Sequence, residues 1–307
     1  MPITHSDTSE EHPQGRYLRS ARDLAVDELP VLPSVVVRLM SLTPESEKFF
    51  EEVLTVASED PGLALRVIRT ANSPMSAPRS PITSLEAAVA RLGANHIADL
   101  VTTVAIARVF VPRTLGETEL WLHAIEVATA CRALVERVHV DGVAPEHAYL
   151  GGLLHDIGRF ILFDQAPQFI QAVDDLAWTT PDELIQAEQQ ICGIDHAKLG
   201  GRVCAHWDVP EPILTVVKNH HQQLADVPRP ASALLAVVKA ADWLSIWHRT
   251  HDDTCDLADA ARRDLSELEL GSTLDFAATI TTELANLLPT VRAASSQAAQ
   301  HLGLRTR

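Results

Sequence analysis

The chain has 307 residues, of which 46% are hydrophobic, and it carries a formal net charge of −16. The apolar content excludes a disordered protein, and the length allows one large or two medium-sized domains, each with a core. An acidic surface of this kind repels phosphate backbones, so the charge argues against general nucleic-acid binding.

The sequence predicts a cytoplasmic protein without membrane contact. Its longest apolar runs, such as residues 231–238, are too short to span a bilayer, and residues 1–15 are polar rather than signal-like. The four cysteines form no CxxC pair, which fits a reducing compartment and argues against a disulfide framework.

Residues 1–20 are polar and lack periodicity, which predicts a flexible tail. From residue 21 to residue 115, capping signals alternate with apolar stripes and predict an N-terminal module of about five helices. Asp60 should cap one helix, a capping box at Thr83 should open another, and a nearly all-apolar helix is expected over residues 96–111.

A second helical module is predicted over residues 116–250. We expect Pro145 to begin a single helix that includes His155 and Asp156 and continues to Phe163. Helical spacing and caps predict the other helices of this module at residues 118–138, 181–191, 196–207, 210–221 and 231–248.

Residues 251–307 are predicted to form a C-terminal helical extension. We expect a final helix over residues 273–288, with the last dozen residues frayed. The extension could serve dimerisation or pack on the second module.

The segment Gly151–Gly158 places a histidine and an aspartate side by side in an otherwise apolar stretch. Ionisable groups in such surroundings are rarely buried without a partner. A metal ion is a partner that suits both His155 and Asp156.

Other ionisable residues of the second module could share this site. Glu119 and His123 lie four residues apart on one predicted helix and so face the same way. Asp242 lies in an apolar helix, where a carboxylate needs a partner. Each residue alone is weak evidence, since a lone histidine on a helix is more often structural. The remaining candidates are His196, His220 and His221.

The order of these residues resembles the HD superfamily of metal-dependent phosphohydrolases, and more closely the HDOD family of bacterial signalling proteins. Segments of the first module resemble the HDOD family independently: residues 29–33, 60–61, 68–73, 82–88 and 92–93. The resemblance covers about residues 24–250. It implies an all-α fold with an N-terminal helical bundle followed by an HD-type helical domain.

HDOD proteins are similar in this half to the HD-GYP cyclic-dinucleotide phosphodiesterases, whose matching motifs bind iron or manganese. The resemblance therefore implies one to three divalent ions, iron or manganese, with Asp156 as a natural bridge between two of them. Such ions can generate hydroxide and stabilise a leaving phosphate oxygen. Carried over by motif, the ligands would be Glu119, His123, His155, Asp156, His196, His220, His221 and Asp242.

Two departures from the HD-GYP pattern count against catalysis. The Gly-Tyr-Pro loop that should follow the paired histidines is replaced by residues 222–228, and the usual lysine is Arg159. An arginine can still grip phosphate, so the missing loop is the more serious change. If the protein is an enzyme, Asp156 and Arg159 would be its catalytic residues.

We therefore expect a signalling or regulatory module with an HD-type metal site, acting on an unidentified signalling protein through its helical surface. A metal-dependent phosphohydrolase or cyclic-dinucleotide phosphodiesterase is the second hypothesis. The third is a metal-free helical scaffold in which these residues form a buried polar network. A phosphate-containing small ligand would suit the site, and the sequence leaves the oligomeric state open.

Overall fold

The computed structural model describes most of the chain, namely residues 20–25, 29–30, 32–41, 47–138, 140–227, 231–250, 260 and 274–304. Within these ranges all regular secondary structure is helical, which confirms the predicted all-α class. No helix in them is both long and apolar enough to cross a membrane. Apart from Ser20, the predicted tail lies outside the described residues, as do residues 251–273 apart from Ala260.

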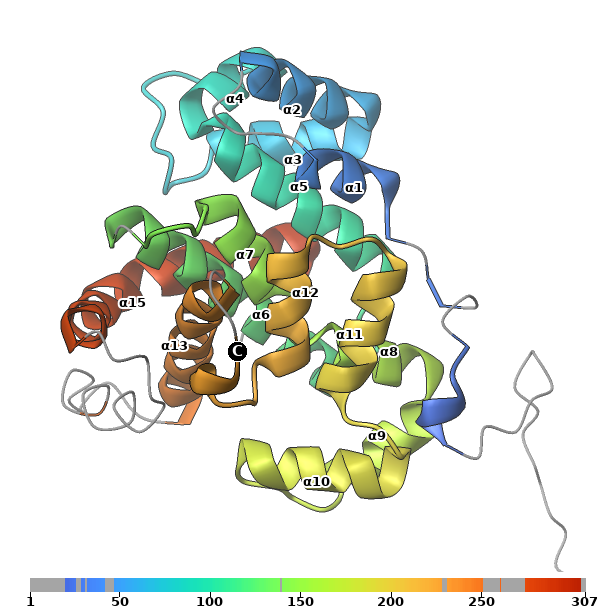
Figure 1. The fold of residues 1–307 in the computed structure, drawn as a ribbon. Helices are drawn as coiled ribbons and strands as arrows, with labels where there is room; N and C mark the ends of the chain where they lie inside the picture. The colour runs from blue at the N-terminus through green and yellow to red at the C-terminus, as the bar shows by residue number, and fades with distance from the viewer. Residues whose placement is uncertain are drawn as a thin grey trace, which may run out of the picture.

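The helices over residues 34–109 gather at one end of the molecule, whereas the short 3-10 helix over residues 21–23 lies apart from them, near Cys192 (Figure 1). Asp60 caps α3 as predicted, accepting hydrogen bonds from two backbone amides of its first turn. The cap of α4 is Ser84 rather than Thr83. The elements are η1 (Ala21–Asp23), α1 (Ser34–Met40), α2 (Glu47–Glu59), α3 (Pro61–Ala71), α4 (Leu85–Leu92) and α5 (Ala94–Val109).

The remaining helices surround α6 and α7, and α9 and α10 lie at the end opposite to α2–α4 (Figure 1). Capping boxes at Thr114 and Thr180 open α6 and α10. The elements are α6 (Leu115–Arg137), α7 (Pro145–Leu154), α8 (Ile157–Gln165), α9 (Pro167–Asp174), α10 (Pro181–Cys192), α11 (His196–His206), α12 (Glu211–Asn219), η3 (Leu224–Asp226), α13 (Ala231–Thr250) and α15 (Leu274–Leu302).

Two sequence predictions about helix extent are wrong. The expected single helix over residues 145–163 is broken at His155 and Asp156, which separate α7 from α8. The final helix does not end at residue 288: α15 continues to Leu302 and contains Pro289. This helix packs against α6, and its buried residues Leu284, Leu287 and Val291 belong to the same core as α6, which explains why it persists past the proline.

Two hydrophobic cores meet along α5. Its first half, including Ile97 and Val101, packs in the core of the N-terminal helices, whereas Ile106 and Phe110 pack in the larger core around α6 and α7. Between them Asp99 forms an ion pair with Arg132 of α6, and both side chains are buried. The helix α5 therefore joins the two sets of helices rigidly.

Close packing of α8 on α11 depends on Gly158, because a Cβ atom there would lie 2.0 Å from the backbone oxygen of His196. Gly151, on α7, offers a matched control, since its added Cβ would lie 3.6 Å from the nearest atom, a methyl group of Val238. Both substitutions gain the same helix propensity from alanine.

Gly158→Ala is expected to lower the free energy of unfolding by about 1–3 kcal/mol or more, because α8 must move away from α11. Gly151→Ala should be as stable as the parent or up to about 1 kcal/mol more stable, because it gains helix propensity without a clash. Urea denaturation of the two variants checks this. Equal stability would show that the contact between α8 and α11 is not as tight as described.

Candidate metal centre

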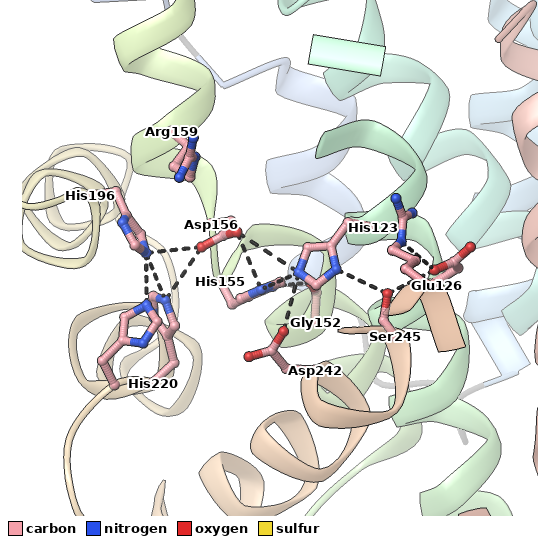
Figure 2. Close-up of polar contacts among 12 residues, drawn as sticks. His123, Glu126, Gly152, His155, Asp156, Arg159, His196, His220, Asp242 and Ser245 are labelled. Atoms are coloured by element: carbon pink, nitrogen blue, oxygen red, sulfur yellow. Dashed lines mark hydrogen bonds and ion pairs between the residues drawn. The ribbon is translucent and has the colours of Figure 1, made fainter. Parts of the chain in front are cut away.

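Seven of the eight predicted ligands come together from five separate segments (Figure 2). They form two groups, and within each group the ligand atoms all lie within 4.8 Å of one another. The first group is Asp156, His196, His220 and His221, and the second is His123, His155 and Asp242.

The ring nitrogens of each group face one another. In the first group, the Nε2 atom of His196 lies 3.1 Å from that of His220 and 2.9 Å from that of His221. In the second group, the Nε2 atom of His123 lies 3.3 Å from that of His155 and 3.2 Å from Oδ1 of Asp242.

The Asp156 carboxylate lies between the two groups. Its Oδ1 atom is 3.1 Å from Nε2 of His196 and 3.4 Å from Nε2 of His220. Its Oδ2 atom points the other way, 3.7 Å from Nε2 of His155 and 3.9 Å from Nε2 of His123. Each oxygen therefore serves a different group (Figure 2).

Helix ends position most of these side chains. Asp156 has φ −99° and ψ 17°, outside helical geometry, and this break between α7 and α8 turns its carboxylate toward the histidines. Asp195 caps α11 through the amide of Lys198 and so fixes His196 as the first helical residue. His220 follows the last turn of α12.

In His155 and His220 the second ring nitrogen faces a backbone acceptor. Nδ1 of His155 lies 2.7 Å from the carbonyl of Gly152, and Nδ1 of His220 lies 3.0 Å from that of Val217. Because a carbonyl can only accept, Nδ1 carries the proton in both rings. A neutral ring of this tautomer presents a bare lone pair at Nε2, toward the centre of the site.

This arrangement fits a metal ion. Nε2 lone pairs 3.1 Å apart repel each other unless a proton or a cation lies between them, and the Nδ1–H to carbonyl bond is the usual companion of a metal-bound imidazole. Mixed imidazole and carboxylate donors suit iron, manganese or zinc, and the donor set contains no thiolate.

Charges in the pocket shift the pKa values of its members. Burial opposes ionisation of Asp156, but His155 and His196 outweigh it and hold the pKa of the carboxyl well below its ordinary value. Burial also disfavours the charged form of His196, yet Glu188 and Asp156 raise its pKa to about 10. For His221 burial prevails and lowers the pKa to about 2. Before metal binds, a proton therefore stays on His196, and an ion must displace it.

The innermost histidines are almost closed to solvent: His155 and His196 are 1% exposed and His220 is 4% exposed. The side chains of Asp156 and His123 remain 13% and 14% exposed. The site is therefore not sealed from solvent, since members of both groups, including His221, remain partly exposed.

Two residues named from the sequence lie elsewhere. Glu119 is exposed on α6 and belongs to neither group, one turn before His123. Arg159 is 7% exposed, stacks against Trp178, and binds Asp174 at 3.1 Å. Its guanidinium is thus engaged by protein groups.

Glu188 was missed by the sequence reasoning. It is fully buried on α10, and its Oε2 atom accepts hydrogen bonds from Nδ1 of His196 at 2.6 Å and from the His196 amide at 2.8 Å. Arg159 lies 3.7 Å from the other oxygen. The signal was present in the sequence, because Glu188 falls on the apolar stripe of α10 with Leu184 and Ala187.

A second supporting chain holds His123. Its Nδ1 atom lies 3.0 Å from the hydroxyl of Ser245, which donates to Glu126 at 2.7 Å (Figure 2). Ser245 lies on α13 one turn after Asp242, so the same helix supplies one candidate ligand and the support of another, His123.

The raised pKa of His196 gives a prediction for protein kept in a chelator. A histidine whose pKa rises from 6.5 to about 10 on folding stabilises the protein fully below pH 6.5, and this contribution is lost as the pH rises through 10. Glu188→Gln removes the carboxylate that does most to raise the pKa of His196. The difference in unfolding free energy between the parent and Glu188→Gln should narrow between about pH 6 and about pH 9.5. A constant difference in urea denaturation would contradict this charge assignment.

Comparison with known proteins places these features in a family. The chain matches a protein from Treponema pallidum (strain Nichols), whose function is not characterised, with 21% identity over 226 residues, or 71% of this chain and 42% of that protein. This chain thus spans less than half the length of that relative.

Solved structures share the fold. An HDOD domain protein of unknown function from Geobacter sulfurreducens has a TM-score of 0.70 and 27% identity, covering 89% of this chain and 94% of that one. A protein provisionally named a phosphohydrolase, from Shewanella amazonensis SB2B, has a TM-score of 0.68 and 24% identity, covering 89% and 96%. The sequence model of the HDOD domain matches residues 29–223. The chain therefore belongs to the HDOD family.

Proposed function

We propose that this chain is a regulatory module of bacterial signalling that holds divalent metal ions, iron or manganese, and acts on a partner protein through its helical surface. The observation that carries the proposal is the position of Asp156, whose two oxygens face two separate groups of imidazoles. Family membership supports the signalling role.

The residues that would hold metal are the two groups that share Asp156. His196, His220 and His221 would bind on one side of its carboxylate, and His123, His155 and Asp242 on the other. A bound divalent ion supplies Lewis acidity and positive charge there. The protein supplies the orientation of four of the five rings: Glu188, the Gly152 and Val217 carbonyls and Ser245 fix the Nδ1 side of His196, His155, His220 and His123 respectively.

Ligands from five segments would make metal occupancy a constraint on the whole second module. Binding energy at such a site is also folding energy, because the unfolded chain has no preformed site. A change in the bound ion would alter how α6, α8, α11, α12 and α13 are held together. A partner that contacts those helices could sense this state.

Two features favour regulation over catalysis. Arg159, the residue that could grip a phosphate, is held by Asp174, Glu188 and Trp178. The segment after His221, where related phosphodiesterases carry a substrate loop, is a short 3-10 helix over Leu224–Asp226. Without groups that position a substrate, bound metal gives poor catalysis.

A metal-dependent phosphohydrolase is the second candidate. The observation in its favour is that Asp156, His123 and Asp242 keep 13%, 14% and 21% of their side chains exposed. A phosphate-containing ligand could approach there. The metal-free scaffold is the third candidate, with a proton on His196 in place of the ion.

We also place the protein in the cytoplasm, where the partner would be an intracellular signalling protein. Cys131, Cys192 and Cys204 are free and buried, and burial raises the pKa of each thiol, as suits a reducing compartment.

Metal content tests the site directly. Protein purified without chelator should contain at least about one equivalent of iron or manganese, and His155→Ala should lose most of it and melt at a lower temperature. His206→Ala is the control, because His206 is an exposed histidine at the end of α11. Less than about a tenth of an equivalent of any transition metal in the parent would favour the metal-free scaffold.

Hydrolysis separates the first two candidates. The metal-loaded protein is incubated with cyclic dinucleotides and with a generic phosphodiester. No turnover above the His155→Ala background is expected, since Arg159 is engaged by protein groups rather than free to position a phosphate. Turnover that disappears in His155→Ala would make the phosphohydrolase the correct function.

A further inference from the structure

A cavity of about 160 Å³ lies where the N-terminal helices meet α6 and the end of the chain. Its walls are mostly apolar and include Val104, Val111, Trp121, Leu302 and Leu304. It opens to solvent beside Val111, which is 54% exposed. An apolar cavity of about 150 Å³ accepts a benzene ring, so this one has room for a body of that size.

Two arginines, Arg66 of α3 and Arg108 of α5, line the same cavity. Arg108 is neutralised by an ion pair with Asp60, whose carboxylate also caps α3. The guanidinium of Arg108 lowers the pKa of Asp60 to about 2, so that partner stays ionised.

Arg66 has no such partner. It is half-buried, and among the described residues no carboxylate lies within ion-pair distance of its guanidinium. Burial, and then Arg108 and Arg69, lower its pKa. Asp60, which is paired with Arg108, offsets this only in part, and the guanidinium remains charged. An arginine left unpaired beside other cations, in a chain of net charge −16, marks a place where an anion is missing.

We propose that this cavity binds a small organic carboxylate with an apolar body of about ring size, its carboxylate paired with Arg66 and its body against Trp121. The fork of a guanidinium matches a carboxylate in a bidentate pair. The apolar walls reject a bare inorganic ion, which would stay better solvated in water. This inference goes beyond the proposed function, because none of its residues belongs to the metal centre.

The position of the cavity connects it to the metal centre. Trp121 lies two residues before His123 on α6, and its ring packs on Phe160 of α8 with centroids 4.6 Å apart. Its indole N–H donates to the carbonyl of Phe110, at the end of α5. A ligand against Trp121 therefore contacts the helix that carries His123, and Trp121 itself packs on α8, the helix that follows Asp156.

Calorimetric titration of the full chain with benzoate tests the proposal. Benzoate should bind the parent with an affinity on the order of millimolar, as expected of so small a ligand, with or without chelator. Arg66→Gln should weaken binding at least about tenfold by removing the bidentate pair. Arg69→Gln is the matched control: it removes the same charge one turn away, from a residue that does not line the cavity, and should bind like the parent.

A second variant and two further ligands complete the test. Ala107→Leu fills the cavity from another wall and should also weaken benzoate binding at least about tenfold. Benzamide, the neutral analogue, and inorganic phosphate should each bind at least about tenfold more weakly than benzoate.

The proposal is overturned if benzoate gives no binding heat with the parent, or binds Arg66→Gln or Ala107→Leu as well as the parent. If benzamide binds as tightly as benzoate, the negative charge of the ligand plays no role and the proposal fails. If inorganic phosphate binds as tightly as benzoate, the apolar ring plays no role and the proposal fails likewise. Benzoate is expected to bind in the presence of chelator as well. If the metal prediction proves wrong, the benzoate experiment therefore still tests this proposal.

Discussion

The carboxylate of Asp156 is the point on which the second module depends. It is a charge buried among helices, and its oxygens reach Nε2 of His196 at 3.1 Å and Nε2 of His155 at 3.7 Å. A carboxylate cannot be buried this way without positive partners. Protons on the imidazoles or metal ions between them are the two ways to provide them, and both draw the same five segments together.

The backbone is built to present this charge. The chain leaves helical geometry at Asp156, and Gly158 then lets α8 approach the backbone of His196 on α11. Glu188 holds the far side of that histidine, and Arg159 balances the charge of Glu188. Arg159, which could have bound a substrate phosphate, thus helps to support His196, a candidate ligand. This fits the proposal of a site that holds an ion better than one that turns over a substrate.

Signals from neighbouring residues predicted the helices well. Features that depend on contacts between residues distant in sequence were predicted less well. The caps at Asp60 and Thr180 depend on neighbouring residues and could be read directly. The break at Asp156 could not, because no proline marks it and its carboxylate contacts His196 and His220, which are distant in sequence. The order of histidines predicted which residues converge, but Glu119, although one turn from His123, is exposed. Asp60 forms its ion pair with Arg108 and not with Arg66, and this pairing is visible only in the structure.

The most direct test is an anomalous scattering map, recorded at the iron and manganese absorption edges, from crystals of protein prepared without chelator. The account predicts strong peaks on both sides of the Asp156 carboxylate, one among His196, His220 and His221 and one among His123, His155 and Asp242. A map without peaks, with His196 hydrogen-bonded directly to Asp156, would contradict it and leave a protonated polar network in a helical scaffold.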